Sequence, residues 1–92
     1  MQYTNSQIKA LIRECIESPE TGYSKVEALI HEWVIGDNAE RDREVLCYWL
    51  LDGLTYEAIT ERYMLAHPTL SLSEATVKRI INNRSPKLFE HL

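Results

Sequence analysis

The sequence contains no hydrophobic run long enough to cross a bilayer. Its longest apolar stretches are short, such as Tyr48 to Leu51, whereas a spanning helix needs roughly 20 apolar residues. The opening "MQYTNSQIK" also lacks the basic start and the apolar stretch of a signal peptide. We therefore expect a cytoplasmic protein with no membrane partner.

Cysteine is scarce as well, with only Cys15 and Cys47, which are too few for a disulfide scaffold. Both fall on apolar positions of helical patterns, so we expect buried thiols that act as small hydrophobic groups. His31, His67 and His91 share no ligand spacing with either cysteine, and no metal site or cofactor is predicted. Because no Ser-His-Asp order and no glycine-rich phosphate loop is present, we do not expect an enzyme.

The residues that are present have the balance of a folded domain. Hydrophobic residues make up 45% and charged residues 26%, with three Gly and three Pro among 92 residues. This length predicts one domain, residues 1–92, near the lower end of what folds without disulfides or metals. No alternating strand pattern occurs, so the expected fold is all-α with five helices. The divisions are a helical pair at 1–36, three helices within 38–83 and a tail at 84–92.

Two amphipathic helices are predicted within residues 1–36. Thr4 and Gln7 offer a capping box for the first, which "SPETG" ends. Ser24 forms a second box with a glutamate three residues on, and Gly36 stands where a left-handed cap would end that helix. The apolar stripes expected to face the core are Ile8, Leu11, Ile12, Cys15 and Ile16 in the first helix, and Val26, Leu29, Ile30 and Trp33 in the second.

A third and a fourth helix follow. Asp37 or Asn38 caps the third, and Gly53 ends it. Thr55 caps the fourth, which ends near His67 because a residue before proline is disfavoured in a helix. Inward-facing residues are expected at Val45, Leu46, Trp49 and Leu50 in the third helix, and at Ala58, Ile59, Tyr63 and either Met64 or Leu65 in the fourth.

The fifth helix is predicted over about residues 73–83. Ser71 opens a capping box, and Ser73 is an equally good cap one register later. Ser85-Pro86 is expected to end the helix and to leave a short apolar tail that folds back on the core. Val77, Ile80 and Ile81 form the core side, which leaves to solvent or a partner the residues Glu74, Thr76, Lys78, Arg79, Asn82 and Asn83.

Charge is distributed unevenly along the chain, whose formal net charge is -4. Residues 1–61 hold five basic and twelve acidic side chains, a net charge of -7. Residues 62–92 hold five basic and two acidic side chains, a net charge of +3. Since local charge on the docking face decides whether counterions are released, the C-terminal third is the predicted surface for a polyanion.

The segments "RDREVLCYWLLDGLTYEAITERY" and "LSEATVKRIINN" resemble the helix-turn-helix of bacterial sigma factor region four and of LuxR-type response regulators. The resemblance covers roughly residues 41–83, with the pieces in the same order. Where those families have a short turn, this chain has the nine residues "YMLAHPTLS", which predict an extended turn. Small phage and mobile-element regulators of the ArpU and RinA type are where we expect such variation. The matching pieces are Arg43-Glu44-Val45-Leu46, Gly53-Leu54-Thr55, Glu57 with Ile59, and Leu72 to Lys78.

Together with the five helices predicted from periodicity, the resemblance implies a five-helix bundle with a C-terminal helix-turn-helix. It also implies a sequence-specific transcription regulator that binds double-stranded DNA. The helix at 73–83 then lies in the major groove. Base contacts are expected from Glu74, Lys78, Arg79 and Asn82, which lie near its N-terminal turns and exposed side. Contacts to the DNA backbone are expected from Thr55, Ser73, Thr76, Asn83, Arg84 and Lys87.

Other interpretations remain open. Lys78, Arg79 and Arg84 also suit an ordinary solvated helix face. The chain can instead be a helical protein–protein interaction module whose acidic N-terminal face binds RNA polymerase, another transcription protein or a second copy of itself. The apolar stripes of the first two helices either cover the core of the motif or leave a strip for a homodimer.

Overall fold

The structure, a computed structural model, describes residues 4–17 and 22–90. The chain forms, in order, α1 (Asn5–Glu17), α2 (Gly22–Trp33), α3 (Ala39–Leu46), the π-helical turn η1 (Cys47–Leu51), α4 (Tyr56–Ala66) and α5 (Glu74–Glu90). These residues include five α-helices and no strand, which confirms the predicted all-α fold. The stop at 18–21 and the side chains of Ile12, Cys15, Ile16 and Phe89 lie outside the described part, as does His91.

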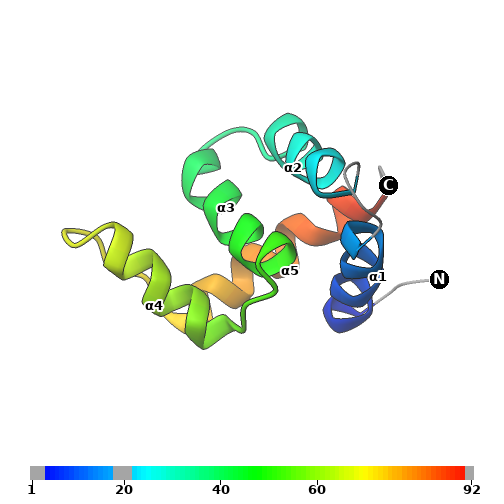
Figure 1. The fold of residues 1–92 in the computed structure, drawn as a ribbon. Coiled ribbons are helices and arrows are strands. Elements are labelled where there is room, and N and C mark those ends of the chain that lie inside the picture. The colour runs from blue at the N-terminus through cyan, green and yellow to red at the C-terminus, as the bar shows by residue number, and fades with distance from the viewer. Residues whose placement is uncertain (1–3, 18–21, 91–92) are drawn as a thin grey trace.

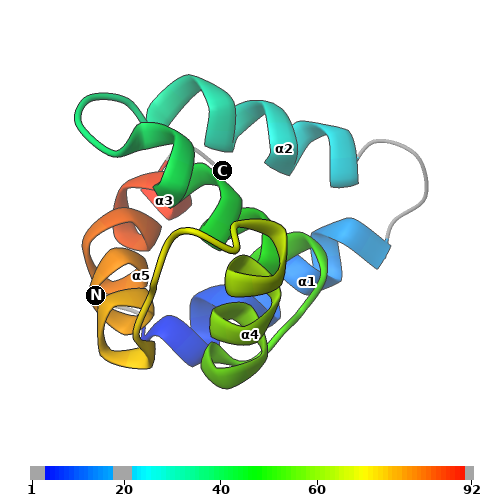
Figure 2. The same cartoon turned by 90° about the vertical axis from the view of Figure 1, so that its left-hand side faces the viewer.

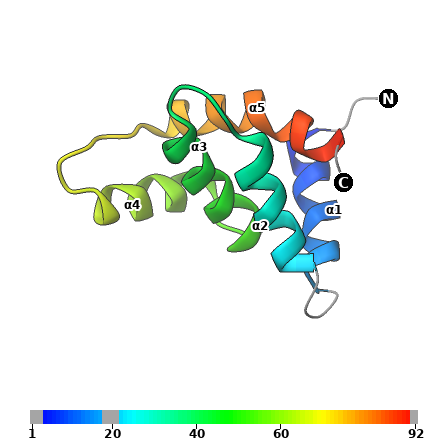
Figure 3. The same ribbon diagram turned by 90° about the horizontal axis from the view of Figure 1, so that it is seen from above.

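Helix α5 connects the two ends of the molecule. Figure 1 shows α1 and α2 at one end, while α4 and the loop that follows it extend at the other. Figure 3 shows α5 running along the molecule between these ends, and Figure 2 shows α2 lying across the other helices. Because α5 contacts α1, α2, α3 and α4, the N-terminal pair packs on the same helix that carries the predicted DNA contacts.

One hydrophobic cluster forms the core and draws residues from every helix. The predicted inward positions Val26, Ile30, Val45, Ile59 and Val77 are buried. Burial of such side chains stabilises by about 1.5 to 3 kcal/mol each relative to exposure. The buried apolar set is Ile8, Val26, Ile30, Val34, Val45, Leu46, Trp49, Leu50, Leu51, Ile59, Tyr63, Leu72, Val77, Ile80, Ile81 and Leu88.

Leu11 and Trp33 were predicted to face inward but are exposed, and so are both of the alternatives for the fourth helix, Met64 and Leu65. Trp33 is the last residue of α2, and the following residue, Val34, takes the buried position. Met64 and Leu65 lie in the last turn of α4, which projects away from α1 and α2 (Figure 1). A helical stripe thus remains buried only as far as a neighbouring element covers it.

Three predicted helix caps are confirmed. The backbone N–H of Thr4 donates to Oε1 of Gln7 (2.9 Å), and that of Gln7 donates to Oγ1 of Thr4 (3.2 Å). Oγ1 of Thr55 accepts from the N–H of Ala58, and Oγ of Ser73 accepts from the N–H of Thr76, at 3.2 and 3.1 Å. Each bond satisfies an N–H that has no partner within its own helix.

The predictions for two other caps are corrected. Helix α2 begins at Gly22, so Ser24 lies within its first turn rather than before it. Asn38 occupies the position before α3, but its backbone is left-handed (φ 61°) and its side chain makes no capping hydrogen bond. The left-handed conformations expected at Gly36 and Gly53 are present, with φ values of 93° and 69°. Side chains strain this conformation, whereas glycine adopts it freely.

The third predicted helix changes to a wider turn at η1. The N–H of Asp52 donates to the carbonyl of Cys47, five residues earlier, at 3.2 Å. This turn buries three consecutive side chains, Trp49, Leu50 and Leu51. Apolar periodicity alone does not distinguish such a π-helical turn from the α-helix in which it occurs.

The predicted end of the fifth helix at Ser85-Pro86 is wrong, because α5 continues through Pro86 to Glu90. Ser85 and Leu88 are both buried. Leu88, which follows the proline, thus reaches the core as part of the helix and not as part of a separate tail. Tertiary packing of Leu88 overrides the local preference of proline to end a helix.

The loop between α4 and α5 begins with a turn. Helix α4 ends at Ala66, as predicted from the proline that follows His67. The N–H of Leu70 donates to the carbonyl of His67 (3.0 Å), which places Pro68 at the second position of the turn, where its fixed φ is favourable. Leu70 is exposed, whereas Leu72 is buried just before α5 begins.

Candidate nucleic-acid interface

The outer face of α5 carries cationic side chains opposite its buried face. Val77, Ile80 and Ile81 point into the core, so the helical period places Lys78 and Arg79 outward. Lys87 is exposed further along the helix. Within the part of the chain that the structure describes, Lys78, Arg79 and Lys87 form no hydrogen bond or ion pair. The residues predicted to contact bases, Glu74, Lys78, Arg79 and Asn82, are all exposed on this helix.

The start of α5 is held by its own hydroxyl groups. The Oγ of Ser73 and the Oγ1 of Thr76 lie 2.8 Å apart, in addition to the capping bond from the Thr76 N–H. Glu74 lies in the first turn, where the negative charge of a carboxylate interacts favourably with the helix dipole. Ser73 and Thr76, predicted to contact the DNA backbone, therefore also stabilise the helix end.

A groove of about 310 Å³ lies between the start of α3 and the outer side of α5. We call it the α3–α5 groove. Its α3 wall includes Asp37, Asn38, Arg41 and Asp42, and five predicted DNA-backbone or base contacts form its α5 wall: Thr76, Arg79, Asn83, Arg84 and Lys87. The contribution of α3 to this groove has no signal in the sequence, because it arises from the packing of α3 against α5.

Asp42 lies at the centre of the charges in this groove. Its side chain is almost fully buried, with the residue 5% exposed. Oδ1 accepts a hydrogen bond from Nε of Arg41 (3.1 Å), and Oδ2 accepts one from Nε of Arg84 (3.0 Å). Nη1 of Arg84 also donates to the carbonyl of Ile35 (3.1 Å). Arg84 thus has a structural role besides its predicted contact to DNA.

Two polar residues of the segment that resembles sigma region four, Arg43 and Glu44, form hydrogen bonds to neighbouring elements. Arg43 donates to the carbonyls of Val34 (2.8 Å) and His31 (3.1 Å), near the end of α2. Such bonds satisfy carbonyls that have no partner at a helix C-terminus. The spacing of the motif gave no signal for this contact, because the carbonyls belong to another helix.

Glu44, the next residue of the motif, joins α3 to the loop after α4. Nε2 of His67 donates to the Glu44 carboxylate, with distances of 2.8 and 3.0 Å to its two oxygens. The hydroxyl of Tyr48 donates to the same carboxylate at 3.1 Å. Burial and this hydrogen bond to Glu44 raise the pKa of the Tyr48 hydroxyl. Tyr63 packs its ring against His67, with centroids 4.5 Å apart.

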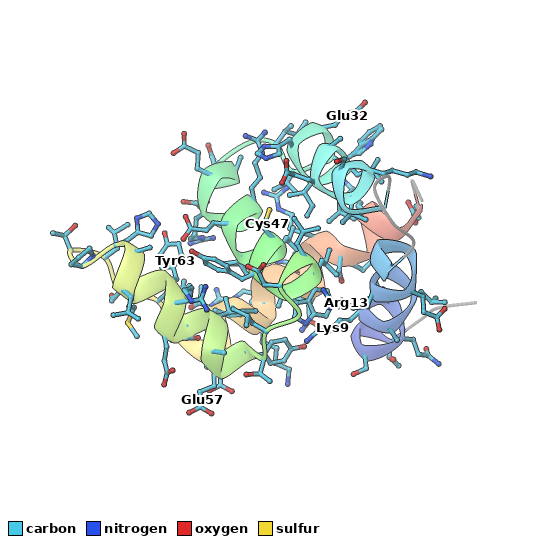
Figure 4. The ribbon with its side chains drawn as sticks, in the orientation of Figure 1. Lys9, Arg13, Glu32, Cys47, Glu57 and Tyr63 are labelled. Carbon is cyan, nitrogen blue, oxygen red and sulfur yellow. The ribbon has the colours of Figure 1, made fainter. Side chains whose placement is uncertain are left out.

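Thr55 lies away from the α3–α5 groove. It borders a separate cavity of about 270 Å³ together with Ser6, Lys9, Trp49 and Tyr56. Figure 4 shows Lys9 and Arg13 on α1 near the end of η1. Lys9 donates to the carbonyl of Leu54 (3.0 Å), and Arg13 donates to that of Leu51 (2.6 Å). Burial and the positive charge of Arg13 lower the pKa of Lys9.

Cys47 is half-buried within η1, in partial agreement with the predicted buried thiol. Burial, together with nearby carboxylates including Glu27, raises the pKa of the Cys47 thiol to about 11. The thiol is therefore protonated at neutral pH, and a protonated thiol is a poor nucleophile and metal ligand. Across residues 4–17 and 22–90, no group of three or more His, Cys, Asp or Glu residues is placed to hold a metal ion.

No helix in the described ranges has the length and apolar character needed to cross a membrane. Comparison of the chain with models of protein families, with curated proteins and with solved structures finds no match. The likeness to sigma region four and LuxR-type regulators accordingly rests on the residues of this sequence. The helix-turn-helix and its DNA contacts stay predictions.

Proposed function

We propose that this protein is a cytoplasmic, sequence-specific DNA-binding transcription regulator of bacterial or phage type, with α5 in the major groove of double-stranded DNA. The observation that supports the proposal is the outer face of α5. Lys78, Arg79 and Lys87 have no intramolecular partner among the described residues. No carboxylate occurs between positions 75 and 87.

Unpaired cations on an exposed helix suit a phosphate backbone, because each one that contacts a phosphate releases a condensed counterion. The first three turns of α5 are the part that can approach base edges, through Glu74, Lys78, Arg79 and Asn82. Lys87 lies more than two helical turns beyond Arg79. This separation from the turns that contact bases suits a contact to a phosphate of the DNA backbone. Guanine is the base that an arginine recognises best, through two parallel hydrogen bonds.

The test is fluorescence anisotropy with a labelled duplex of random sequence, at about 50 and 200 mM salt. We expect binding at the lower concentration that weakens steeply at the higher one. Arg79→Gln removes one positive charge and should weaken binding to this duplex, though less than binding to a preferred site. Lys25→Gln should leave it unchanged, because Lys25 is exposed on α2, outside the proposed interface. Absence of binding by the parent protein at the lower salt concentration would contradict the proposal.

A second candidate function, a protein–protein interaction module, is favoured by two apolar side chains at the end of α2. Trp33 is 40% exposed and Ile35 is 63% exposed, and Glu32 is exposed beside them. Exposed large apolar groups within an acidic surface suit a second copy of the chain, RNA polymerase or another transcription protein. Sedimentation equilibrium at micromolar concentration tests the homodimer, which Ile35→Glu should dissociate. If the parent protein is a monomer, the homodimer is excluded, and the partner of this surface must be a different protein.

A further inference from the structure

The α3–α5 groove gathers positive charge from two parts of the chain that lie far apart in sequence. Four cationic side chains, Arg41, Arg79, Arg84 and Lys87, and two carboxylates, Asp37 and Asp42, border it, which gives a net charge of +2. Its volume of about 310 Å³ is well above the roughly 10 to 15 Å³ that a cavity needs to hold one water molecule. The groove therefore has room for a small anion together with part of its hydration shell.

Asp42 binds one cationic side chain from each wall of the groove and neutralises only one of the two charges. Its two oxygens each accept one hydrogen bond, from Nε of Arg41 and from Nε of Arg84. One carboxylate between two guanidinium groups leaves a net charge of +1. Asp42 is also buried, so its own charge is shielded from an anion in the groove by the arginines that it holds.

Arg41 keeps most of its hydrogen-bonding capacity for a ligand. A guanidinium carries five N–H donors, and the Arg41 side chain uses only Nε within the described part of the chain. Its side chain is 33% exposed and borders the groove. Asn83 and Lys87 face the same groove from α5 with no intramolecular partner among the described residues. Donors from both walls thus converge on one space.

We infer that the α3–α5 groove binds a single phosphate group, held between Arg41 on α3 and Lys87 and Asn83 on α5. The inference rests on the proposed function, under which the phosphate belongs to the DNA backbone. Oxygen atoms of a phosphate accept several hydrogen bonds at once, and a guanidinium positioned in advance matches them well. Such a contact fixes the position of α5 on the duplex and is independent of base sequence.

Asp37 is the groove residue that opposes an anion. It is exposed at the edge of the groove and has no intramolecular partner within the described ranges. Its carboxylate repels a phosphate, and no guanidinium offsets it as two offset Asp42. Removing the charge of Asp37 should therefore strengthen binding of the phosphate, whereas the loss of Arg41 or Lys87 should weaken it.

Two measurements on the full chain test the inference. The first is the slope of log K against log salt for a random-sequence duplex. Arg41→Gln and Lys87→Gln should each lower the magnitude of this slope by about 1 and weaken binding to all duplexes alike. Asp37→Asn should strengthen binding, and Lys25→Gln should change neither quantity. Lys87 forms no hydrogen bond or ion pair within the described part of the chain, so Lys87→Gln keeps the test valid if Arg41→Gln misfolds.

The second measurement is a titration with inorganic phosphate, followed by the backbone amide NMR signals of Arg41 and Asn83, against sodium chloride at equal ionic strength. We expect phosphate-specific shifts that are lost in Lys87→Gln. Duplex binding with slopes unchanged in both groove variants would overturn the inference and leave the proposed function intact. Phosphate shifts without duplex binding would support the phosphate site, with a free phosphorylated compound as its source, and overturn the DNA function. Absence of both would overturn both.

Discussion

Arg84 on α5 and Asp42 on α3 form an ion pair in which Nε of the arginine lies 3.0 Å from Oδ2 of the carboxylate. The same arginine donates to the carbonyl of Ile35, in the segment after α2. One side chain therefore links the helix proposed to bind DNA to two elements of the preceding half. Because Asp42 also holds Arg41, a single buried carboxylate positions both arginines.

Asp42→Asn should destabilise the protein by about 1.5 to 3 kcal/mol, the range for hydrogen bonds to charged groups. The substitution keeps the shape of the side chain but removes its charge and one acceptor oxygen, which leaves two guanidinium groups near each other without their carboxylate. Urea unfolding followed by circular dichroism measures the change. Asp37→Asn is the matched control and should change stability by less than about 0.5 kcal/mol, the range for exposed sites. Equal effects of the two substitutions would contradict a structural role of the ion pair.

Pro86→Ala should stabilise the protein by about 1 to 3 kcal/mol. Proline inside a helix removes a backbone donor and is less favourable than alanine by about 3 kcal/mol, part of which its stiffness in the unfolded chain offsets. Pro86 is exposed within α5, so its replacement removes no core contact. Thermal unfolding measures the effect, with Lys87→Ala as a control at the next exposed position. Unchanged stability of the Pro86→Ala variant would contradict a helix that continues through Pro86, because alanine stabilises only a residue that is helical.

Local rules predicted the elements of this fold where the determining atoms are close in sequence. The caps at Thr4, Thr55 and Ser73 depend on a side chain and an N–H three residues apart, and all three are present. The end of α4 before His67 depends on the adjacent proline. Those predictions required no knowledge of the tertiary arrangement.

Two local predictions failed, the caps at Ser24 and Asn38. The other predictions that failed depend on neighbouring elements. Pro86 favours a helix end locally, but the burial of Leu88 outweighs it. Leu65 continues an apolar stripe, yet it lies in the last turn of α4 and is 79% exposed. In the α3–α5 groove, the residues of α5 were predictable from periodicity. Arg41 and Asp42 border the groove only because α3 packs beside α5, which the sequence pattern does not reveal.

His67→Ala should leave the fold intact but loosen the loop after α4. The bond between His67 and Glu44 is partly exposed, and pairs of that kind stabilise by roughly 1 kcal/mol or less. Amide hydrogen exchange should therefore become faster between residues 68 and 72, with little change in α3. Thr69→Ala, at an exposed position of the same loop, serves as the control. Unchanged exchange in the His67 variant would show that the turn itself, and not this contact, orders the loop.

Cys47 should react slowly with iodoacetamide in the folded protein. With its pKa raised from 9.0 to about 11, the thiolate fraction at pH 8 is about 100-fold lower than for an unshifted thiol. The unfolded thiol ionises first as the pH rises, so this group also makes stability fall between about pH 9 and 11. Alkylation of a Cys15→Ser variant, with and without urea, measures the ratio. Equal rates in both conditions would contradict the raised pKa.

Arg79→Ala should reduce discrimination between DNA sequences, whereas Lys87→Gln should not. Arg79 lies in the second turn of α5, within the part of the helix that can reach base edges, and an arginine bound to guanine through two hydrogen bonds contributes roughly 1 to 3 kcal/mol of discrimination. Lys87 is placed to contact a phosphate, which is the same in every sequence. A duplex library selected with the parent protein provides the preferred site, and competition between that site and random duplex measures each variant. The arginine variant should lose about 10-fold to 100-fold in the ratio of the two affinities, which corresponds to most of that energy range. Loss of affinity for both duplexes in equal proportion would reassign Arg79 to the DNA backbone, because only a contact to a base distinguishes one sequence from another.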